Sequence, residues 1–420
     1  MRDGTNTNFW SSTESGTNAW RRNLNVSEAR VNRNTNDKLN GFSVRCLKDW
    51  LIKPAISGGF NNYMQLSLFE TANNQEMNSR WGRAPSTRFQ TPLTASGTST
   101  CALLYDLFQA YYDARINKRN TINALAFEID YEKKLFELYE QITNRAYQIS
   151  RSICFIVFKP VKREIFAADF RDRIVHHLIY NYINPIFEPK FINDSYSCRT
   201  GKGTSYGIKR LEHFIRSCTQ NYTKDCYILK LDIEGYFMAM DRTLLYERIK
   251  NHLINSNPKI HFDVNLVLYL LQIIIFNDPT KNCIIKGKKA DWKGLPPTKS
   301  LFYSGNNKGF PIGNLTSQLF GNIYLNDFDH YIKYKLGIKY YGRYVDDFVI
   351  VHPNKEYLKS IIPLLSDYLQ SHLSLKLHPK KIYLQHYTKG VKFLGVVVKP
   401  YRIYIGNQTK GTFYKKIQLK

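Results

Sequence analysis

The stretch YGRYVDDFVIVHPN, residues 341–354, places two adjacent acids between two apolar runs. The apolar residues on either side predict two short strands joined by a tight turn, which together form a β-hairpin. In a buried setting, Asp346 and Asp347 would repel one another, and each carboxyl would tend to stay protonated. The pair therefore needs either water, as in an exposed turn where aspartate is common, or a cation.

A third acid favours the cation. Asp232 ends an apolar strand in LKLDIEGYF, residues 229–237. Three carboxylates at strand ends can converge if one or two cations lie between them, and such oxygen ligands suit Mg²⁺. Two ions could hold the attacking 3′-hydroxyl and the leaving pyrophosphate of an in-line phosphoryl transfer. Alone, the Asp-Asp pair favours a solvated turn; with Asp232 and a basic chain, the pattern favours a metal site.

The composition points to a polyanionic partner. Lys and Arg total 60 against 34 acids, a formal charge of +26 over 420 residues, which is enough chain for two or three domains. Because each neutralised phosphate releases counterions, this charge favours nucleic-acid binding. The 30 Tyr and 25 Phe would suit bases stacked on aromatic rings. The alternative is a merely soluble basic surface, with most rings in the core.

The cysteines and the N-terminus indicate a cytoplasmic protein. The seven cysteines are scattered without a Cys-x-x-Cys pair, which argues for reduced thiols and against a zinc site or a disulfide framework. The N-terminal residues MRDGTNTNFW contain no apolar signal core. No apolar run reaches the roughly 18 residues of a membrane-spanning helix, so we expect no membrane association.

The periodicity changes along the chain. Residues 1–40 hold nine asparagines, and residues 52–101 are rich in Ser, Thr, Asn, Gly and Pro with weak periodicity. From Leu103 onward, helical spacing alternates irregularly with strand-like runs, which favours a mixed α/β domain over a doubly wound parallel sheet. Residues 277–309 are expected to form a loop or hairpin insertion, and residues 392–405 to form closing strands.

Six motifs, in the expected order, resemble those of a reverse transcriptase from about Leu103 to Tyr404. LKLDIEGYF and YVDD resemble its two catalytic palm motifs. The other four are similar to its fingers motif, its nucleotide-pocket helix and its last palm motifs, at residues 158–179, 309–326, 375–384 and 391–398. The resemblance implies a right-hand polymerase with a mixed α/β palm, largely helical fingers and an incomplete thumb. Such an enzyme copies an RNA template into DNA from a primer, using dNTPs and two Mg²⁺ ions.

The resemblance implies roles for the acids and for two neighbouring residues. Asp232 and Asp346 match the acids that hold the metal ions, and Asp347 matches an auxiliary acid. The backbone carbonyl of Ile233 would complete one metal shell. Phe237 matches the ring that presses on the sugar 2′ position and favours deoxynucleotides, with an ordinary core aromatic as the alternative.

The resemblance also assigns four basic residues. Lys159 and Arg163 match fingers residues that bind the incoming triphosphate, where Arg can engage phosphate with two N–H groups. Arg173 either braces the fingers through an acid or is purely structural. Lys381 matches a lysine proposed to protonate the leaving pyrophosphate, and the alternative is an exposed lysine in a Lys-rich stretch.

The nucleotide-pocket helix departs from the usual pattern of Gln-Gly followed by Ser-Pro. Here the residues run from Ile312 and Gly313 to Ser317 and Gln318. This form resembles the reverse transcriptases of diversity-generating retroelements, which copy a template RNA and misincorporate opposite its adenines. Ile312 in place of an amide removes a hydrogen-bonding group beside the nascent base pair, so less energy separates right from wrong pairs.

The N-terminal segment has its own resemblance. NFWSSTESGTNAW and NGFSVRCLKDW, at residues 8–20 and 40–50, resemble the end of a C-type-lectin-like or related sulfatase-modifying-type domain. Residues 1–48 are too few to form such a domain. Because asparagine codons begin with two adenines, our hypothesis is a translated template repeat, with an ordinary disordered Asn-rich arm as the alternative. The predicted domains are this segment, a linker, the fingers, the palm and the start of a thumb, at residues 1–48, 49–102, 103–228, 229–400 and 401–420.

Several functions remain open from the sequence. The retroelement interpretation adds an expected partner, a small basic helical-bundle accessory protein that helps to position the RNA. Group II intron and retron-type reverse transcriptases are the alternative enzymes. A catalytically inactive, nucleic-acid-binding polymerase fold and a lectin-like protein are alternatives of another class. The intact acids argue against the inactive fold, and the missing bulk of a lectin domain argues against the last.

Overall fold

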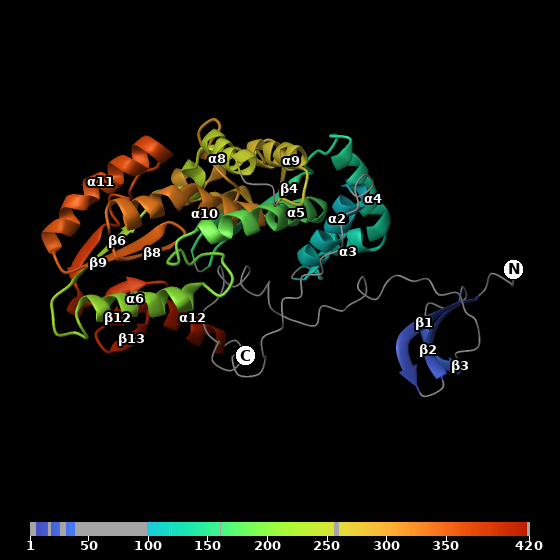
Figure 1. The fold of residues 1–420 in the computed structure, drawn as a ribbon, viewed down its shortest axis with the longest axis horizontal. Coiled ribbons are helices and arrows are strands. Elements are labelled where there is room, and N and C mark those ends of the chain that lie inside the picture. The colour runs from blue at the N-terminus through green and yellow to red at the C-terminus, as the bar shows by residue number, and fades with distance from the viewer. Residues whose placement is uncertain are drawn as a thin grey trace. The chain divides into compact units, whose positions relative to one another are not determined.

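The computed structural model describes residues 6–15, 18–25, 31–37, 99–116, 118, 120–159, 161–255 and 260–417. They belong to two compact units, Met1–Gly59 and Phe60–Lys420. In the first, β1 (Asn6–Ser15), β2 (Asn18–Asn25) and β3 (Val31–Asp37) form an antiparallel sheet in sequence order (Figure 1). This sheet lies within the Asn-rich segment. The predicted linker lies outside the described residues until α2 (Ser99–Arg115) begins.

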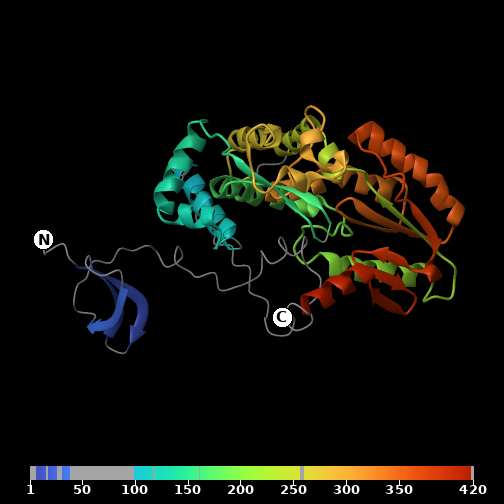
Figure 2. The same cartoon turned by 180° about the vertical axis from the view of Figure 1, so that it is seen from behind.

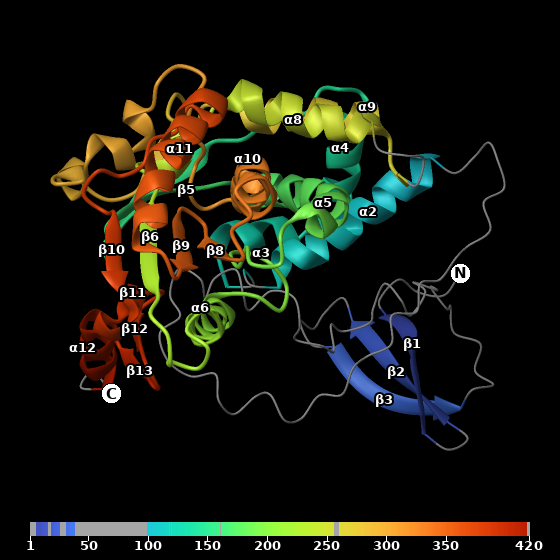
Figure 3. The ribbon, with the colours of Figure 1, turned by 60° about the vertical axis from the view of Figure 1, so that its left-hand side comes forward.

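The second unit is built on an antiparallel sheet with the strand order β10-β6-β9-β8. β8 and β9 form the hairpin that was predicted for residues 341–354, so this prediction is confirmed. Figure 3 shows α6 on one side of the sheet and α10 and α11 on the other. These elements are β6 (Tyr227–Asp232), β8 (Tyr340–Tyr344), β9 (Asp347–His352), β10 (Tyr383–His386), α6 (Thr204–Cys218), α10 (Leu315–His330) and α11 (Lys355–Leu373).

The two faces of this sheet bury two different apolar clusters, because successive strand residues point to opposite sides. Leu231 and Phe348 belong to the large cluster that contains the apolar residues of α10 and α11. Ile228 and Val349 belong to a smaller cluster with α6 and the closing strands. By the same alternation, Asp232 and Asp347 lie on the α6 side of the sheet, at the ends of their strands.

The segment before β6 contains helices and two strands of a small sheet, whose third strand, β7, comes later in the chain. In this sheet, with the order β5-β4-β7, β4 pairs antiparallel with β5 and parallel with β7. The helices α2, α3 and α4, teal in Figures 1 and 2, gather at one end of the unit, and α11 lies at the other. The elements are α3 (Ile122–Glu128), α4 (Tyr131–Thr143), β4 (Ser152–Val157), β5 (Arg163–Ala167), α5 (Phe170–Phe187) and β7 (Cys283–Ile285).

The stretch at residues 277–309 is a loop rather than a hairpin. It follows α8 (Arg242–Asn255) and α9 (Val264–Phe276), lends β7 to the small sheet, and continues in short 3-10 turns. Glu164 of β5 explains this path, because its buried carboxylate accepts hydrogen bonds from Trp292 Nε1 at 2.6 Å, Ser300 Oγ at 2.8 Å and Leu301 N at 2.6 Å. A buried carboxylate needs such partners, so the loop folds around it.

The predicted closing strands are confirmed. β11 (Val391–Phe393), β12 (Val396–Lys399) and β13 (Arg402–Ile405) form an antiparallel sheet in sequence order, followed by α12 (Asn407–Ile417). With these elements, the predicted mixed α/β class is also confirmed. Among the described residues, no helix has the length and apolar character needed to cross a bilayer.

Gly342 offers a test of how tightly β8 is packed. A Cβ at this position would lie 2.8 Å from Cζ of the buried Tyr196 ring, and closer still to its hydroxyl. We expect Gly342→Ala to lower the free energy of unfolding by about 1–3 kcal/mol, measured by chemical denaturation, because the core is overpacked. Adding Tyr196→Phe, which removes the nearest atom, should recover part of this loss.

Gly411 in α12 is the matched control, because nothing lies within 4 Å of a Cβ built there. Gly411→Ala should leave stability unchanged or raise it by up to about 1 kcal/mol. Equal stabilities for Gly342→Ala and the wild type would contradict the packing described for β8.

Candidate active site

The pairing of β6 with β9 brings the three predicted acids together. Asp232 lies directly opposite Asp347 in the antiparallel register, and the amide of Ile233 donates to the carbonyl of Asp346 at 3.2 Å. Val345 and Asp346 form the turn between β8 and β9, and Val345 has a φ of +57°. All three acids and Ile233 line one cavity of about 420 Å³.

Removal from water and mutual repulsion perturb two of these acids. Burial, helped by the charge of Asp232, raises the pKa of Asp346 to about 6, although Lys381 and Arg163 act in the opposite direction. Burial also raises the pKa of Asp347 to about 7 despite its ion pair with Lys230, whose Nζ lies 3.0 Å from Oδ2. Burial is thus the largest cause of both raised pKa values, and the neighbouring cations offset it only in part.

The carboxylate oxygens of this cavity are suitable ligands for a divalent cation, although the three side chains do not form a ready metal site. Within the described ranges, no three His, Cys, Asp or Glu side chains form a ready metal cluster. Lys381 Nζ instead donates to both carboxylate oxygens of Asp232 at 2.9 Å. Asp347 Oδ1, however, is buried and has no hydrogen-bond partner in the described part of the chain. An orphaned carboxylate oxygen at this place is the kind of ligand that Mg²⁺ prefers.

The structure separates the predicted basic residues. Arg163, at the start of β5, is exposed and lines the cavity beside the acids. Lys159 is exposed in the loop between β4 and β5 and does not line the cavity. Arg173 lies on α5, away from the cavity; burial lowers its pKa, and the charge of Asp169 opposes that change. The role of Arg173 as a brace of the fingers stays a prediction.

The start of the α10 segment is held against β5. The carbonyl of Ile312 accepts a hydrogen bond from the amide of Phe166 at 2.9 Å, and the Ile312 side chain packs with the buried ring of Phe166. Gly313 has a φ of +130°, and a Cβ there would lie 2.9 Å from the Phe166 carbonyl oxygen. Glycine is thus required by both the conformation and the close approach. Ile312 and Gly313 line the cavity together with Gln318.

Gln318 adds a polar side chain to the lining of the cavity, and Phe237 adds an apolar one. Gln318 Oε1 is buried and, among the described residues, has no hydrogen-bond partner, so it is available to a ligand. Phe237 is half-buried: its ring packs against the large core cluster and also lines the cavity. A Cβ at Gly321 of α10 would lie 3.4 Å from the Phe237 ring, so this helix limits where the ring can move. Phe237 can therefore be both a core aromatic and a residue that faces the sugar of a bound nucleotide.

Several residues around the site were not found from the sequence. Lys230 lies two positions before Asp232, so strand periodicity alone places it on the same face as the acids. The amide of His378 donates to the carbonyl of Asp232 at 2.8 Å, and His378 lines the cavity. Thr298 and Lys299 reach the cavity from the 277–309 loop, for which no sequence signal existed.

Comparison with known proteins gives a family and several distant relatives. Residues 161–398, more than half of the chain, match the family model described as Reverse transcriptase (RNA-dependent DNA polymerase). Protein YkfC of Escherichia coli (strain K12) is 24% identical over 258 residues, which cover 54% of this chain and 60% of YkfC. The chain therefore spans about three fifths of the length of this curated relative.

Among solved structures, the chain is similar to two telomerases. One is apo telomerase from Candida tropicalis truncated from its C-terminal domain, with 14% identity, a TM-score of 0.44, and coverage of 63% of this chain and 58% of that one. The other is telomerase from Candida albicans in complex with a TWJ fragment of telomeric RNA, with 14% identity, a TM-score of 0.43, and coverage of 66% and 51%.

The raised pKa of Asp347 predicts a pH-dependent stability in the absence of divalent ions. Because its pKa is about 7 in the folded protein and 3.8 ordinarily, the native state binds more protons between these values, and stability falls as pH rises through this window. Asp347→Asn should therefore be more stable than the wild type at pH 8, on the order of 1–3 kcal/mol, and nearly equal to it at pH 4. Chemical denaturation at both pH values measures this difference. A constant difference across the range would contradict the perturbed carboxyl.

Proposed function

The chain belongs to the reverse transcriptase (RNA-dependent DNA polymerase) family and has its right-hand polymerase fold, and on this basis we propose that it extends a DNA primer on an RNA template. The observation that carries the proposal is the convergence of Asp232, Asp346 and Asp347 in one cavity with Arg163 and Gln318. The three acids, the Arg163 guanidinium and the Gln318 amide oxygen, which has no partner among the described residues, suit the binding of a nucleoside triphosphate.

Reverse transcriptase domains use divalent metal ions, and we assign that role here to two Mg²⁺ ions. Asp232, Asp346 and Asp347, with the carbonyl of Ile233, would hold them. Bound there, the ions would stabilise negative charge on the attacking 3′-oxygen and on the leaving pyrophosphate. Lys381 Nζ donates to both oxygens of Asp232, so a metal ion held there would compete with this ion pair.

The other cavity residues act on the nucleotide itself. Arg163 is exposed and can bind triphosphate oxygens with two N–H groups. Phe237 would stand against the sugar 2′ position, where a ribose hydroxyl needs room. Lys381 carries a proton at Nζ close to where pyrophosphate would leave. Lys159, which does not line the cavity, would bind triphosphate only after its loop moves.

The finer class that we propose is a reverse transcriptase of a diversity-generating retroelement, which makes adenine-mutagenised cDNA from a template-repeat RNA. Ile312 supports it, because an apolar side chain packed against the Phe166 cluster occupies the place of an amide. The expected setting is the cytoplasm, with the RNA, a primer and a basic helical-bundle accessory protein as partners. The formal charge of +26 supports contact with a long nucleic acid.

Primer extension tests the proposed activity. Wild-type protein with Mg²⁺, dNTPs and a primed RNA should extend the primer, and Asp346→Asn should lower the rate by at least about 100-fold because a charged metal ligand is lost. Asp367→Asn, an exposed acid of α11, is the matched control and should leave the rate unchanged. Extension that survives Asp346→Asn would overturn the assignment of the three acids.

Ile312 tests the retroelement class. A hydrogen bond restored to the correct nucleotide is worth roughly 0.5–1.5 kcal/mol, or about two- to tenfold in discrimination. Ile312→Gln should therefore lower misincorporation opposite template adenine more than opposite other bases, with total synthesis within a few-fold. Sequencing of cDNA made from a defined RNA measures this. Ile312→Leu, which keeps the site apolar, should retain the wild-type error pattern.

If wild-type protein and Ile312→Gln both copy template adenine with the same low error, the mutagenic interpretation fails. An ordinary reverse transcriptase of another class would remain.

A further inference from the structure

An ion pair with no exposed surface lies behind the turn that carries Asp346. Arg343 of β8 and Asp329 of α10 are both 0% exposed. Arg343 Nε donates to Asp329 Oδ1 at 2.8 Å, and Nη2 donates to Oδ2 at 2.6 Å. Tyr341 adds its hydroxyl to Oδ1 at 2.6 Å. Arg343 shares the face of Tyr341, so the pair lies on the α10 side of the sheet, opposite to Asp232 and Asp347.

The guanidinium of Arg343 also makes a hydrogen bond outside the ion pair. Its Nη1 donates to the carbonyl of Val345 at 2.9 Å. That carbonyl belongs to the peptide bond that leads into Asp346. Val345 is a β-branched residue at a φ of +57°, a conformation that such residues rarely adopt and that persists only when the surroundings enforce it. Arg343 supplies that enforcement directly at the turn.

The main chain of Arg343 is held as firmly as its side chain. Its amide donates to the carbonyl of Asp194 at 2.9 Å, and its carbonyl accepts from the amide of Tyr196 at 2.9 Å. Nη2 also donates to Ser195 Oγ at 3.3 Å. Residues 194–196 therefore run along the outer edge of β8 as a short parallel bridge.

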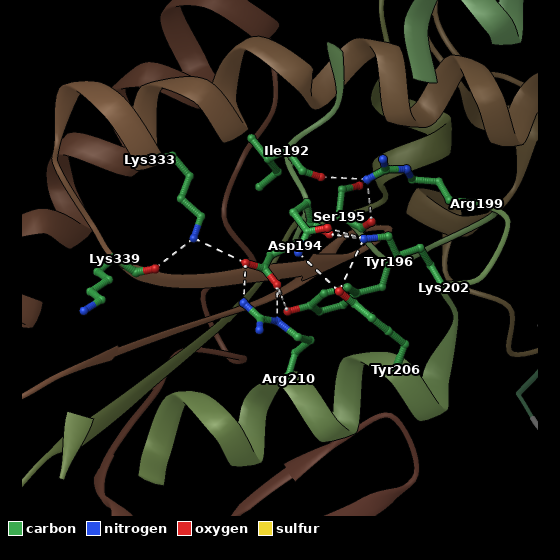
Figure 4. A network of polar contacts seen from close by, with 11 residues as sticks. Ile192, Asp194, Ser195, Tyr196, Arg199, Lys202, Tyr206, Arg210, Lys333 and Lys339 are labelled. Atoms are coloured by element: carbon green, nitrogen blue, oxygen red, sulfur yellow. Dashed lines mark hydrogen bonds and ion pairs between the residues drawn. The ribbon is translucent and has the colours of Figure 1, made fainter. Parts of the chain in front are cut away.

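Figure 4 shows the polar contacts that hold residues 194–196 in place. The Asp194 carboxylate accepts from Arg210 of α6 at 2.7 and 3.1 Å, and Lys333 Nζ lies 3.5 Å from it. The carbonyl of Ser195 accepts from Arg199 Nη1 at 2.9 Å. The support of the turn thus extends from α6 on one face of the sheet to α10 on the other.

From these contacts we propose that Arg343 and Asp329 are a positioning pair for the catalytic turn. Asp329 aims the guanidinium, and the guanidinium sets the peptide between Val345 and Asp346, which orients Asp346. Burying two charges is a poor way to gain stability, because desolvation offsets their attraction. A planar fork that reaches a carboxylate with two N–H groups and a carbonyl with a third is a device that Lys and apolar residues lack. The proposal rests on the proposed function, in which Asp346 is catalytic.

The test separates positioning from folding with two variants. Arg343→Met combined with Asp329→Leu removes both charges, so neither is left buried without a partner, and such replacements are commonly tolerated. Arg343→Lys keeps the charge opposite Asp329 but loses the fork. We expect folded proteins with primer-extension kcat lowered roughly 10- to 100-fold and KM for dNTP changed less than about threefold, because a displaced turn misplaces the acid.

Hydrogen exchange gives a readout that needs no reaction. The peptide that contains residues 344–347 should exchange faster in both variants, while peptides from α11 keep their wild-type rates. The matched control is Arg248→Met with Asp327→Leu, another Arg–Asp pair that ends on α10, with Nη2 3.0 Å from Oδ2, and that does not contact the turn. It should alter neither kcat nor exchange at the turn.

The outcomes are distinct. A folded double variant or Arg343→Lys with wild-type kcat and wild-type exchange at residues 344–347 would overturn the positioning role. If the double variant does not fold, Arg343→Lys decides by the same criteria. If the wild type itself fails to extend primers, the proposed function fails, and hydrogen exchange alone still decides whether the pair sets the turn.

Discussion

The antiparallel register between β6 and β9 is the constraint on which the site depends. It sets Asp232 opposite Asp347, and the turn that precedes β9 then brings Asp346 to the same cavity. A slip of one residue would move one of these acids to the α10 face and expose the apolar side chains of Phe348 and its neighbours. The two apolar clusters oppose this, because Leu229, Leu231, Phe348 and Ile350 pack in the large one, and Ile228, Val349 and Val351 pack in the smaller one.

Holding three carboxylates in one cavity has an electrostatic cost that the protein meets in part. Lys381 pairs with Asp232 and Lys230 with Asp347, yet the pKa values of Asp346 and Asp347 remain raised to about 6 and 7. Burial thus keeps both carboxyls in an unfavourable setting, at the point where a polymerase brings divalent cations.

Rigid support surrounds this unfavourable arrangement. The Arg343–Asp329 pair and the Asp194 network hold the turn from behind. The carboxylate of Glu164 anchors the 277–309 loop, which brings Thr298 and Lys299 to the cavity from a distant part of the chain. Buried polar groups of this kind constrain geometry strongly because leaving any of them unpaired is costly.

The hairpin at 341–354, the mixed α/β class and the polymerase family could all be predicted from the sequence, because alternation, strand ends and motif order are local properties of the chain. The sequence also indicated the three acids and Arg163, which lie together. Folding in three dimensions was needed to show that Lys159 does not line the cavity, that His378 does, and that Arg343 is a buried partner of Asp329. Those facts depend on which distant segments pack together, and no spacing along the chain records which of its charges will lose water on folding.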